Sequence, residues 1–229
     1  MIEWSLQKVI NDTVNFQKEE KREINSWHCS KLGQCLTGVY LERLGIEPDE
    51  QFDDRTLRVF SAGKMFEQWV VDLAKKSNHV QLEEQVRVEN KELNFSGYAD
   101  LVVDIDGQKL LYEIKSKNSR AFWYMRGKGE GANHHHLMQT WLYLYGLQIQ
   151  EGRILYIEKD SMSVLEYPVK LNNEELENEV MQELKILNEA WKQQLPPPVP
   201  KFDKGDWRAK YCRYHKKCTN CEKYLDLNF

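Results

Sequence analysis

The stretch FSGYADLVVDI, residues 95–105, is followed by Asp106-Gly107 and, one residue later, by KLLYEIKS at residues 109–116. Both stretches are rich in β-branched, aromatic and other apolar residues, which is typical of strands. Asp-Gly between two such stretches is one of the strongest short-range signals for a two-residue turn. The sequence therefore predicts a β-hairpin in the middle of the chain.

A two-residue turn fixes which residues of the hairpin face each other, because opposing residue numbers then sum to 213. Asp100 lies directly opposite Glu113, and the Cβ atoms of such a pair are about 4.5–5.5 Å apart on one face. Lys115 shares that face with Glu113, since side chains alternate along a strand. The other face is expected to be apolar and buried, with Ala99, Leu101, Val103, Ile105, Leu110, Tyr112 and Ile114.

Two carboxylates that converge beside a lysine are suited to binding a cation. Asp100 and Glu113 repel each other unless something neutralises them, and carboxylate oxygens suit Mg²⁺ or Mn²⁺. Such an ion can polarise a phosphate, activate water and stabilise a leaving oxygen. Lys115 can orient the water or balance charge on the phosphate. On these residues alone, a surface hairpin with a cross-strand Glu–Lys pair is an equally good interpretation.

The rest of the chain predicts helices and further strands around the hairpin, so the fold class is α/β or α+β with a central mixed β-sheet flanked by helices. Helices are expected at residues 4–20, 33–45, 56–77, 134–147 and 173–194, strands at 84–89, 153–158 and 163–169, and a glycine-rich loop at 127–131. Helical spacing in the third helix points five apolar side chains toward a core: Phe60, Phe66, Trp69, Val70 and Leu73.

Composition excludes several classes of protein. With 229 residues, 11% aromatic and 30% charged, the chain is neither disordered nor collagen-like. Its longest apolar run, residues 141–147, is too short to cross a bilayer, and the N-terminus does not resemble a secretory signal. We therefore expect a cytoplasmic protein without a membrane partner. The net charge of −4 argues against a protein that coats nucleic acid by charge alone.

Three motifs together resemble the PD-(D/E)XK nuclease superfamily. Gly97-Tyr98-Ala99-Asp100 followed by Glu113-Ile114-Lys115 resembles its core motif, with Gly-Tyr-Ala-Asp in place of a literal Pro-Asp. Gly63-Lys64-Met65-Phe66-Glu67 resembles the G-x(3)-[HE] helix of the RecB-like branch, and Gln139-x(3)-Tyr143 matches its Q-x(3)-Y helix. The motifs occur in the expected order, and their conjunction is specific where each alone is not.

The resemblance implies a restriction-endonuclease-like core at about residues 55–170, inside a body of residues 1–195. It implies that one or two Mg²⁺ or Mn²⁺ ions are held by Glu67, Asp100, Glu113 and the Ile114 carbonyl. Lys115 would position water for attack on a phosphodiester, with Gln139 and Tyr143 as support. The expected DNA contacts are Lys117, Arg120, Arg126, Lys128 and His136, and Phe122, Trp123 and Tyr124 either stack on unpaired bases or pack in the core.

The chain has five cysteines, and an odd number argues for metal ligands or thiols rather than a disulfide framework. Three lie in the segment of residues 196–229, which consists of a proline linker and a Cys-rich tail expected to pack back on the N-terminal Cys segment. Cys35 lies far upstream, with Cys29 as a spare. This layout resembles the RecB-like iron–sulfur nucleases of CRISPR adaptation and the AddB-type subunits. It implies a [4Fe–4S] cluster, with structural Zn²⁺ as the alternative, that joins the two ends of the chain. The implied ligands are Cys35, Cys212, Cys218 and Cys221.

The function that the resemblance implies is a metal-dependent deoxyribonuclease, and within that class an exonuclease on single-stranded or end-unwound DNA. CRISPR spacer acquisition, recombination and DNA repair all fit such an enzyme, as do a homo-oligomer or a partner protein. Three alternatives stay open: a non-catalytic DNA-binding or assembly subunit, a small structure-specific endonuclease, and a zinc-stabilised RNA-processing factor.

Overall fold

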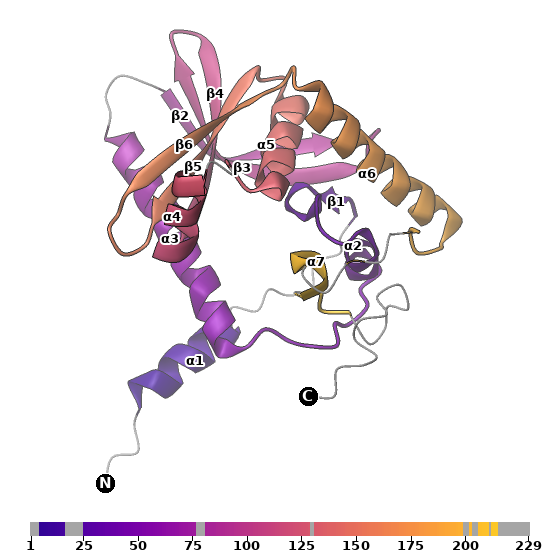
Figure 1. Cartoon of the computed structure of the whole chain (residues 1–229), viewed down its shortest axis with the longest axis horizontal. Helices are drawn as coiled ribbons and strands as arrows, with labels where there is room; N and C mark the ends of the chain where they lie inside the picture. Colours follow the sequence, from indigo (N-terminus) through magenta and orange to yellow (C-terminus); the bar gives the residue numbers. More distant parts are fainter. Residues whose placement is uncertain are drawn as a thin grey trace.

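The computed structural model describes residues 5–16, 25–76, 81–128, 131–198, 202, 206–210 and 212–214. Within them, six strands form one mixed sheet flanked by helices, so the predicted fold class is confirmed (Figure 1). The strands are β1 (Trp27–His28), β2 (Gln81–Asn90), β3 (Phe95–Ile105), β4 (Gln108–Lys117), β5 (Glu151–Glu158) and β6 (Val164–Lys170). The helices are α1 (Leu6–Phe16), the 3₁₀ turn η1 (Cys29–Lys31), α2 (Leu36–Arg43), α3 (Asp54–Lys75), α4 (Ser119–Lys128), α5 (His134–Leu147), α6 (Glu174–Gln193) and α7 (Trp207–Lys210).

Strand β3 organises the sheet, because it pairs with β1, β2 and β4. β2 runs antiparallel along one side of β3. On the other side, the short β1 pairs in parallel with Phe95 and Ser96, and β4 pairs antiparallel from Leu101 onward. β5 joins β4 in parallel after a crossover through α4 and α5, and β6 is antiparallel to β5. Asp100 therefore lies where β3 passes from one neighbour to the other.

The predicted register of the β3–β4 hairpin is confirmed. Leu101 pairs with Tyr112, and the remaining pairs follow the same register to the turn. The two turn residues have positive φ angles, 52° at Asp106 and 86° at Gly107, as a type I′ turn requires. Aspartate and glycine tolerate this conformation better than other residues, so the local sequence selects the turn and the turn selects the register.

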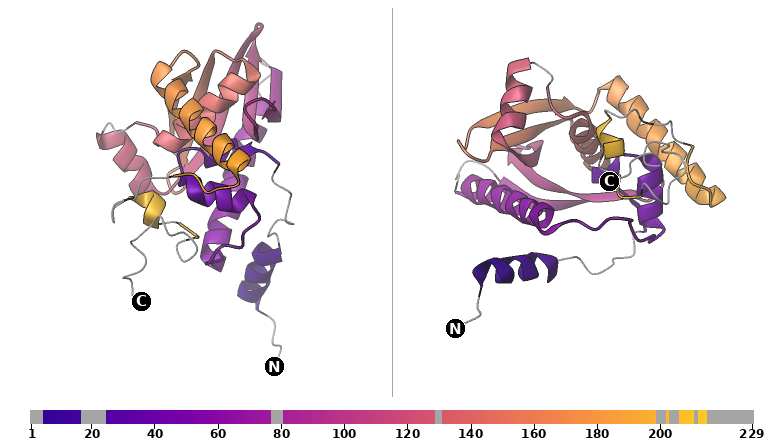
Figure 2. Two further views of the ribbon diagram at one scale, coloured as in Figure 1. Left: turned by 90° about the vertical axis from the view of Figure 1, so that its right-hand side faces the viewer. Right: turned by 60° about the horizontal axis from the view of Figure 1, so that its bottom comes forward.

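Helices cover both faces of the sheet, although we predicted that one face would bury and the other would present the carboxylates. α5 packs against one face, with α6 beside α5 and α2, and α3 packs against the other (Figure 2). Asp100 and Glu113 are consequently both buried. Alternation along a strand identifies its two faces but not the helices that will pack on them.

Side chains along β3 do not alternate regularly between the two faces of the sheet, because the alternation breaks in the middle of the strand. Leu101 faces α3, where it lines an apolar groove of about 210 Å³. Gly97 faces α5 instead, because a Cβ added to it would lie 2.8 Å from Tyr143 Cε1. Ala99 belongs to the core on the α5 side as well. The predicted face that runs unbroken from Ala99 through Leu101 is therefore wrong, since regular alternation would place both residues on one side.

Helix α3 carries an apolar stripe that the described part of the chain leaves largely uncovered. Of its 22 residues, all of them described, Val71 alone is buried. Phe60, Trp69 and Leu73 are exposed, so the prediction that they face the core is wrong. Helical spacing identifies an apolar stripe without specifying what covers it, and the described neighbours of α3 are α1, β2 and β4.

Segments from distant parts of the sequence meet around α2. The backbone N–H of Asp49 donates to the carbonyl of Arg213 at 2.7 Å, which ties the C-terminal segment to the loop after α2. On α2 itself, the guanidinium of Arg43 lies between the rings of Trp27 and Trp191, 4.1 Å from each centroid. Segments near both ends of the sequence are thus fixed to α2.

Several predicted element boundaries need adjustment. α2 begins at Leu36, three residues later than expected, because Gly33 has a φ of 76° in the turn before it. The ten-residue helix α4 was not predicted at all. None of the helices in the described ranges combines the length and the apolar character that crossing a membrane requires.

We expect Gly107→Ala to destabilise the protein and Gly127→Ala to stabilise it. Neither added Cβ meets another atom within 4 Å, so the two substitutions differ in backbone conformation. At the positive φ of Gly107 a side chain costs about 1–2 kcal/mol, whereas alanine inside a helix such as α4 gains about 0.5–1 kcal/mol over glycine. Thermal unfolding measures both, and shifts of the same sign would contradict the turn geometry.

Candidate active site

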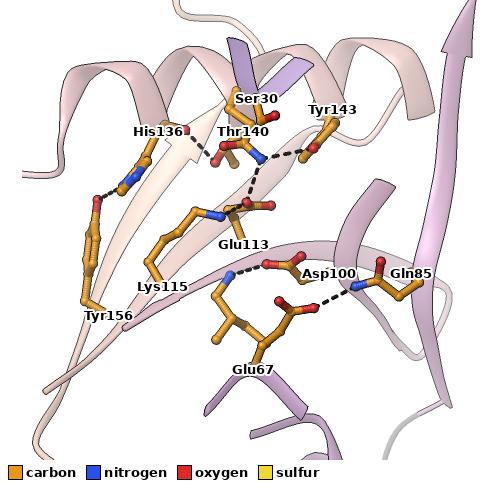
Figure 3. A network of polar contacts seen from close by, with 12 residues as sticks. Ser30, Glu67, Gln85, Asp100, Glu113, Lys115, His136, Thr140, Tyr143 and Tyr156 are labelled. Atoms are coloured by element: carbon orange, nitrogen blue, oxygen red, sulfur yellow. Dashed lines mark hydrogen bonds and ion pairs between the residues drawn. The ribbon is translucent and has the colours of Figure 1, made fainter. Parts of the chain in front are cut away.

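The polar centre of the molecule lies where β3 and β4 separate. Asp100 Oδ2 accepts a hydrogen bond of 2.7 Å from the backbone N–H of Ile114, and this bond fixes one of its carboxylate oxygens between the two strands (Figure 3). The β3–β4 ladder ends at Leu101 and Tyr112, and Asp100 and Glu113 are the next residue of each strand. The two carboxylates lie close enough for their charges to interact, so they converge as predicted just beyond the last paired residues.

Glu113 is held from two sides. Its side chain is 1% exposed, and its Oε1 accepts hydrogen bonds from Lys115 Nζ and, at 2.7 Å, from Gln139 Nε2. Gln139 also donates to the hydroxyl of Tyr143 at 3.0 Å. The structure thus brings together the hairpin residues and the two residues of the Q-x(3)-Y motif on α5, as the sequence predicted.

Glycine is required at position 97 because Tyr143 occupies the space of a side chain there. A Cβ on Gly97 would lie 2.8 Å from Tyr143 Cε1 and 3.1 Å from its hydroxyl oxygen. The first residue of the Gly-Tyr-Ala-Asp motif therefore lets α5 approach β3, and Tyr143 then supports Gln139 beside Glu113.

Glu67 reaches the same centre from α3. Its Oε1 accepts a hydrogen bond of 2.7 Å from the side-chain amide of Gln85 on β2, and it lies close enough to Asp100 for the two charges to interact (Figure 3). Gln85 could not be identified from the sequence, because a glutamine within a regular strand pattern carries no signal of a special role. Three carboxylates from three elements thus face one another around Lys115.

Burial raises the pKa of all three carboxylates above its ordinary value. Burial, with the neighbouring charge of Asp100, raises the pKa of Glu113 to about 8 and that of Glu67 to about 7. Burial also raises the pKa of Asp100. Burial alone would lower the pKa of Lys115, but the surrounding carboxylates together raise it, so this lysine stays charged. As these groups ionise, one ammonium group does not compensate three carboxylates, so the site gains an excess of negative charge as the pH rises.

The carboxylate oxygens of this site are ligand atoms of the kind that a hard divalent cation prefers. Oε2 of Glu113 is buried and has no hydrogen-bond partner among the described residues, which leaves a carboxylate oxygen available as a ligand. As placed, the described residues include no group of three His, Cys, Asp or Glu side chains already gathered around one point. Oε1 of Glu67 accepts from Gln85 and Oδ2 of Asp100 accepts from Ile114, so the second oxygen of each carboxylate lies outside these bonds.

His136, predicted as a phosphate contact, is buried within α5. Its Nδ1 lies 2.7 Å from the hydroxyl of Tyr156, which also accepts from the backbone N–H of Asn133 at 3.2 Å. The imidazole and the tyrosine hydroxyl thus share a hydrogen bond inside the protein. Burial holds the pKa of His136 far below its ordinary value, so the imidazole is neutral. Its contact with phosphate stays a prediction.

The predicted DNA-contacting cations lie at the end of β4 and along α4. Burial and a neighbouring lysine lower the pKa of Lys117 to about 8. Arg120 and Arg126 are exposed on α4, and the guanidinium of Arg126 lies 5.1 Å from the ring centroid of Trp123. The side chain of Lys128 lies outside the described residues.

The aromatic residues of α4 divide between the core and the surface. Phe122 is 0% exposed, so the idea that it stacks on bases is wrong, because the helix turns this side chain onto the sheet. Trp123 is 44% exposed and Tyr124 is also exposed, so both have rings accessible from outside. The surface of α4 thus presents two aromatic rings beside two arginines.

Of the two upstream cysteines, Cys29 lies in the core and Cys35 lies near the C-terminal segment. A Cβ on Gly97 would be 3.2 Å from Cys29 Cβ. A Cβ on Gly38 would be 3.9 Å from Cys35 Cβ and 3.7 Å from the ring of Tyr214, two residues after Cys212. The remaining predicted ligands, Cys218 and Cys221, lie outside the described residues.

Comparisons with known proteins bear on the architecture. No protein-family model matches the chain, and no curated protein matches it. Among solved structures it is similar to SSO0001, at 20% identity and a TM-score of 0.61, over 96% of this chain and 98% of that one. It is also similar to the alkaline exonuclease LHK-Exo of Laribacter hongkongensis, at 14% identity and a TM-score of 0.54, over 75% and 94%. A phage-related exonuclease of Haemophilus somnus 129PT gives 12% identity and a TM-score of 0.50, over 80% and 97%.

The chain shares the fold of these proteins. The likeness to SSO0001 extends over nearly the whole of both chains, so it includes the segments around the sheet as well as the sheet itself. At identities of 12–20% this similarity establishes the architecture. The chemistry has to be argued from the residues of this chain.

We expect the metal-free protein to lose stability as the pH rises from 6.5 to 8. The pKa of Glu113 is raised in the folded state to about 8, so the folded state binds more protons than the unfolded state until the pH passes that value. Its contribution is complete at low pH and is lost as the pH rises through 8. The melting temperature in EDTA measures this decline, and Glu113→Gln should flatten it. A wild-type slope in that variant, with the exposed Glu166→Gln as control, would contradict the assignment.

Proposed function

We propose that the protein is a metal-dependent DNA nuclease. The observation that carries the proposal is the buried Glu113 carboxylate, which has one oxygen held by Lys115 and Gln139 and the other without a partner among the described residues. Asp100 and Glu67 lie close enough to Glu113 for their charges to interact with it. An arrangement in which carboxylates are buried against one another is costly for stability, which favours a role in chemistry over a role in packing.

The ligands in this proposal are the carboxylates of Glu67, Asp100 and Glu113 and the carbonyl of Ile114. Mg²⁺ or Mn²⁺ bound there supplies Lewis acidity to a phosphodiester and its attacking water. Because Lys115 stays protonated, it acts as a fixed positive charge that orients water and stabilises negative charge on phosphate, and not as a base. Gln139 and Tyr143 hold Glu113 in place.

DNA as the substrate is supported by the fold and by the surface of α4. Two of the similar structures are named as exonucleases, and LHK-Exo was also determined in complex with dAMP. In this chain, Trp123 and Arg126 form an exposed aromatic–cation pair on the helix that follows β4. Exposed aromatic rings beside cations bind unpaired bases and phosphates. We therefore infer an exonuclease that acts on single-stranded or end-unwound DNA.

Asp100→Ala should abolish cleavage of end-labelled DNA that depends on Mg²⁺ or Mn²⁺. The variant loses a carboxylate that faces the proposed ion, so the rate should fall by more than the roughly 100-fold that removal of an outer-shell partner costs. Glu166→Gln, an exposed acid on β6, is the matched control and should cleave like the wild type.

The form of the cleavage products separates the alternatives. Mononucleotides released from one end indicate an exonuclease, and internal fragments indicate an endonuclease. Wild-type protein that binds DNA but leaves it intact would favour an assembly subunit. Cleavage that persists in Asp100→Ala would contradict the proposed site.

We also propose that a [4Fe–4S] cluster, with Zn²⁺ as the alternative, is held by Cys35, Cys212, Cys218 and Cys221. What supports Cys35 is its place at the start of α2, next to Gly38, on which Tyr214 of the C-terminal segment packs. Cys29 is buried on the sheet side of η1, against Gly97. A cluster at Cys35 would bind both ends of the chain and stabilise the fold as metal binding couples to folding.

Cys35→Ala should lose the iron and sulfide of protein purified without oxygen, whereas Cys29→Ala should keep them. Both cysteines are buried, so the pair controls for the effect of an added cavity. Elemental analysis and the visible absorption spectrum measure the outcome. Zinc in place of iron would support the alternative metal, and equal loss of metal in both variants would contradict the choice of Cys35.

A further inference from the structure

The ladder between β2 and β3 is interrupted directly opposite Asp100. Glu84 pairs with Leu101, and Val86 pairs with Ala99, so the register places Gln85 across from Asp100. Gln85 has a φ of 49°, in the left-handed region that residues in strands do not normally adopt. No residue is inserted on either strand, since the pairs on both sides share one register. The interruption is therefore a local change of backbone conformation.

The other non-glycine residues with positive φ in the described chain have ordinary structural explanations. Asn94 and Asp106 lie in turns between strands, Met162 lies in the loop between β5 and β6, and Gln148 and Gln194 end α5 and α6. Such positions adopt the left-handed conformation routinely. Gln85 differs because it lies inside β2, with paired residues on both sides. A strained conformation of this kind persists where the surroundings enforce it, and such residues cluster at functional sites.

The interruption changes which face of the sheet each side chain occupies. Before it, Leu82 on β2 and its partner Val103 on β3 line the groove against α3. Beyond it, Val88 contacts Gly146 of α5 on the opposite face. Leu82 and Val88 are six residues apart and would share a face in a regular strand. Because of the conformation at Gln85, the apolar side chains of β2 and β3 pack against α3 on one side of the site and against α5 on the other.

The side chain of Gln85 uses this position to contact α3. Its amide donates a hydrogen bond of 2.7 Å to Glu67 Oε1 (Figure 3). The other oxygen of that carboxylate, Oε2, takes no part in this bond. Of the carboxylates at the site, Asp100 is held by Ile114 and Glu113 by Lys115 and Gln139. Gln85 completes this set, so that each carboxylate has a donor of its own.

We propose that Gln85 is a positioning residue of the carboxylate site, which holds Glu67 toward Asp100 from the strained position opposite that aspartate. The inference rests on the proposed function, since it assigns Gln85 a role in the binding of Mg²⁺ or Mn²⁺. Donors that orient metal-binding carboxylates typically contribute 10–100-fold to affinity. The backbone strain at Gln85 is the corresponding cost in stability.

Gln85→Gly separates the two effects. Glycine adopts a positive φ without strain but lacks the amide, so the variant should melt in EDTA at or above the wild-type temperature while it binds Mn²⁺ about tenfold more weakly. Mn²⁺ affinity is measured by electron paramagnetic resonance of the free ion, without substrate. The control is Gln81→Gly, at an exposed position of the same strand, paired in the ordinary way with Asp104. It should lower the melting temperature and leave Mn²⁺ affinity unchanged.

Two results would overturn the proposal. Wild-type Mn²⁺ affinity in Gln85→Gly would show that the amide does not position the site, and a loss of stability equal to that of Gln81→Gly would show that the backbone at Gln85 is not strained. Both are distinct from failure of the proposed function. If the proposed function is wrong, wild-type protein and Asp100→Ala should bind Mn²⁺ equally. The proposed role of Gln85 would then be wrong as well, because there would be no metal site for it to position.

Discussion

A carboxylate buried between a sheet and a helix is the constraint on which the surrounding structure depends. Burial of an ionisable group is costly unless charged or hydrogen-bonding partners surround it. Glu113 obtains its partners from two elements, Lys115 from its own strand and Gln139 from α5. The position of α5 along the sheet and its rotation about its own axis are therefore fixed, because Gln139 must reach Glu113. Gly97 makes this possible, because it leaves the space that Tyr143 fills beside Gln139.

The same arrangement has opposite consequences for stability and for chemistry. Around Lys115, burial raises the pKa of three carboxylates from β3, β4 and α3, and the charge of Asp100 raises the pKa of Glu67 and Glu113 further. These raised pKa values weaken the metal-free fold at neutral and alkaline pH. Under the proposed function, a bound cation would remove that repulsion, so the property that destabilises the protein without metal would contribute to metal affinity. Proteins commonly tolerate unfavourable local interactions of this kind at sites of function.

The structure could be predicted from the sequence where local conformational preferences allow a single arrangement. A two-residue turn permits one register, so the approach of Asp100 to Glu113 at the end of the paired ladder could be predicted from the hairpin itself. The sequence was insufficient where tertiary packing decides. Phe122 and Trp123 are adjacent aromatic residues, and only the packing of α4 beside β5 determines that the first is buried and the second exposed. Gln85 was out of reach for a different reason, because neither propensity nor alternation signals a positive φ at a glutamine.

The parallel pairing of β4 with β5 has a consequence for the order of folding. The hairpin of β3 and β4 brings together residues close in sequence, whereas β5 reaches β4 only after the chain has passed through α4 and α5. Gln139 lies within that crossover, 26 residues from Glu113. Non-local pairings form late because the loop entropy is lost before the contacts are gained. Closure of the crossover is therefore the event that completes the acidic centre, and a chain arrested before it has the hairpin without the site.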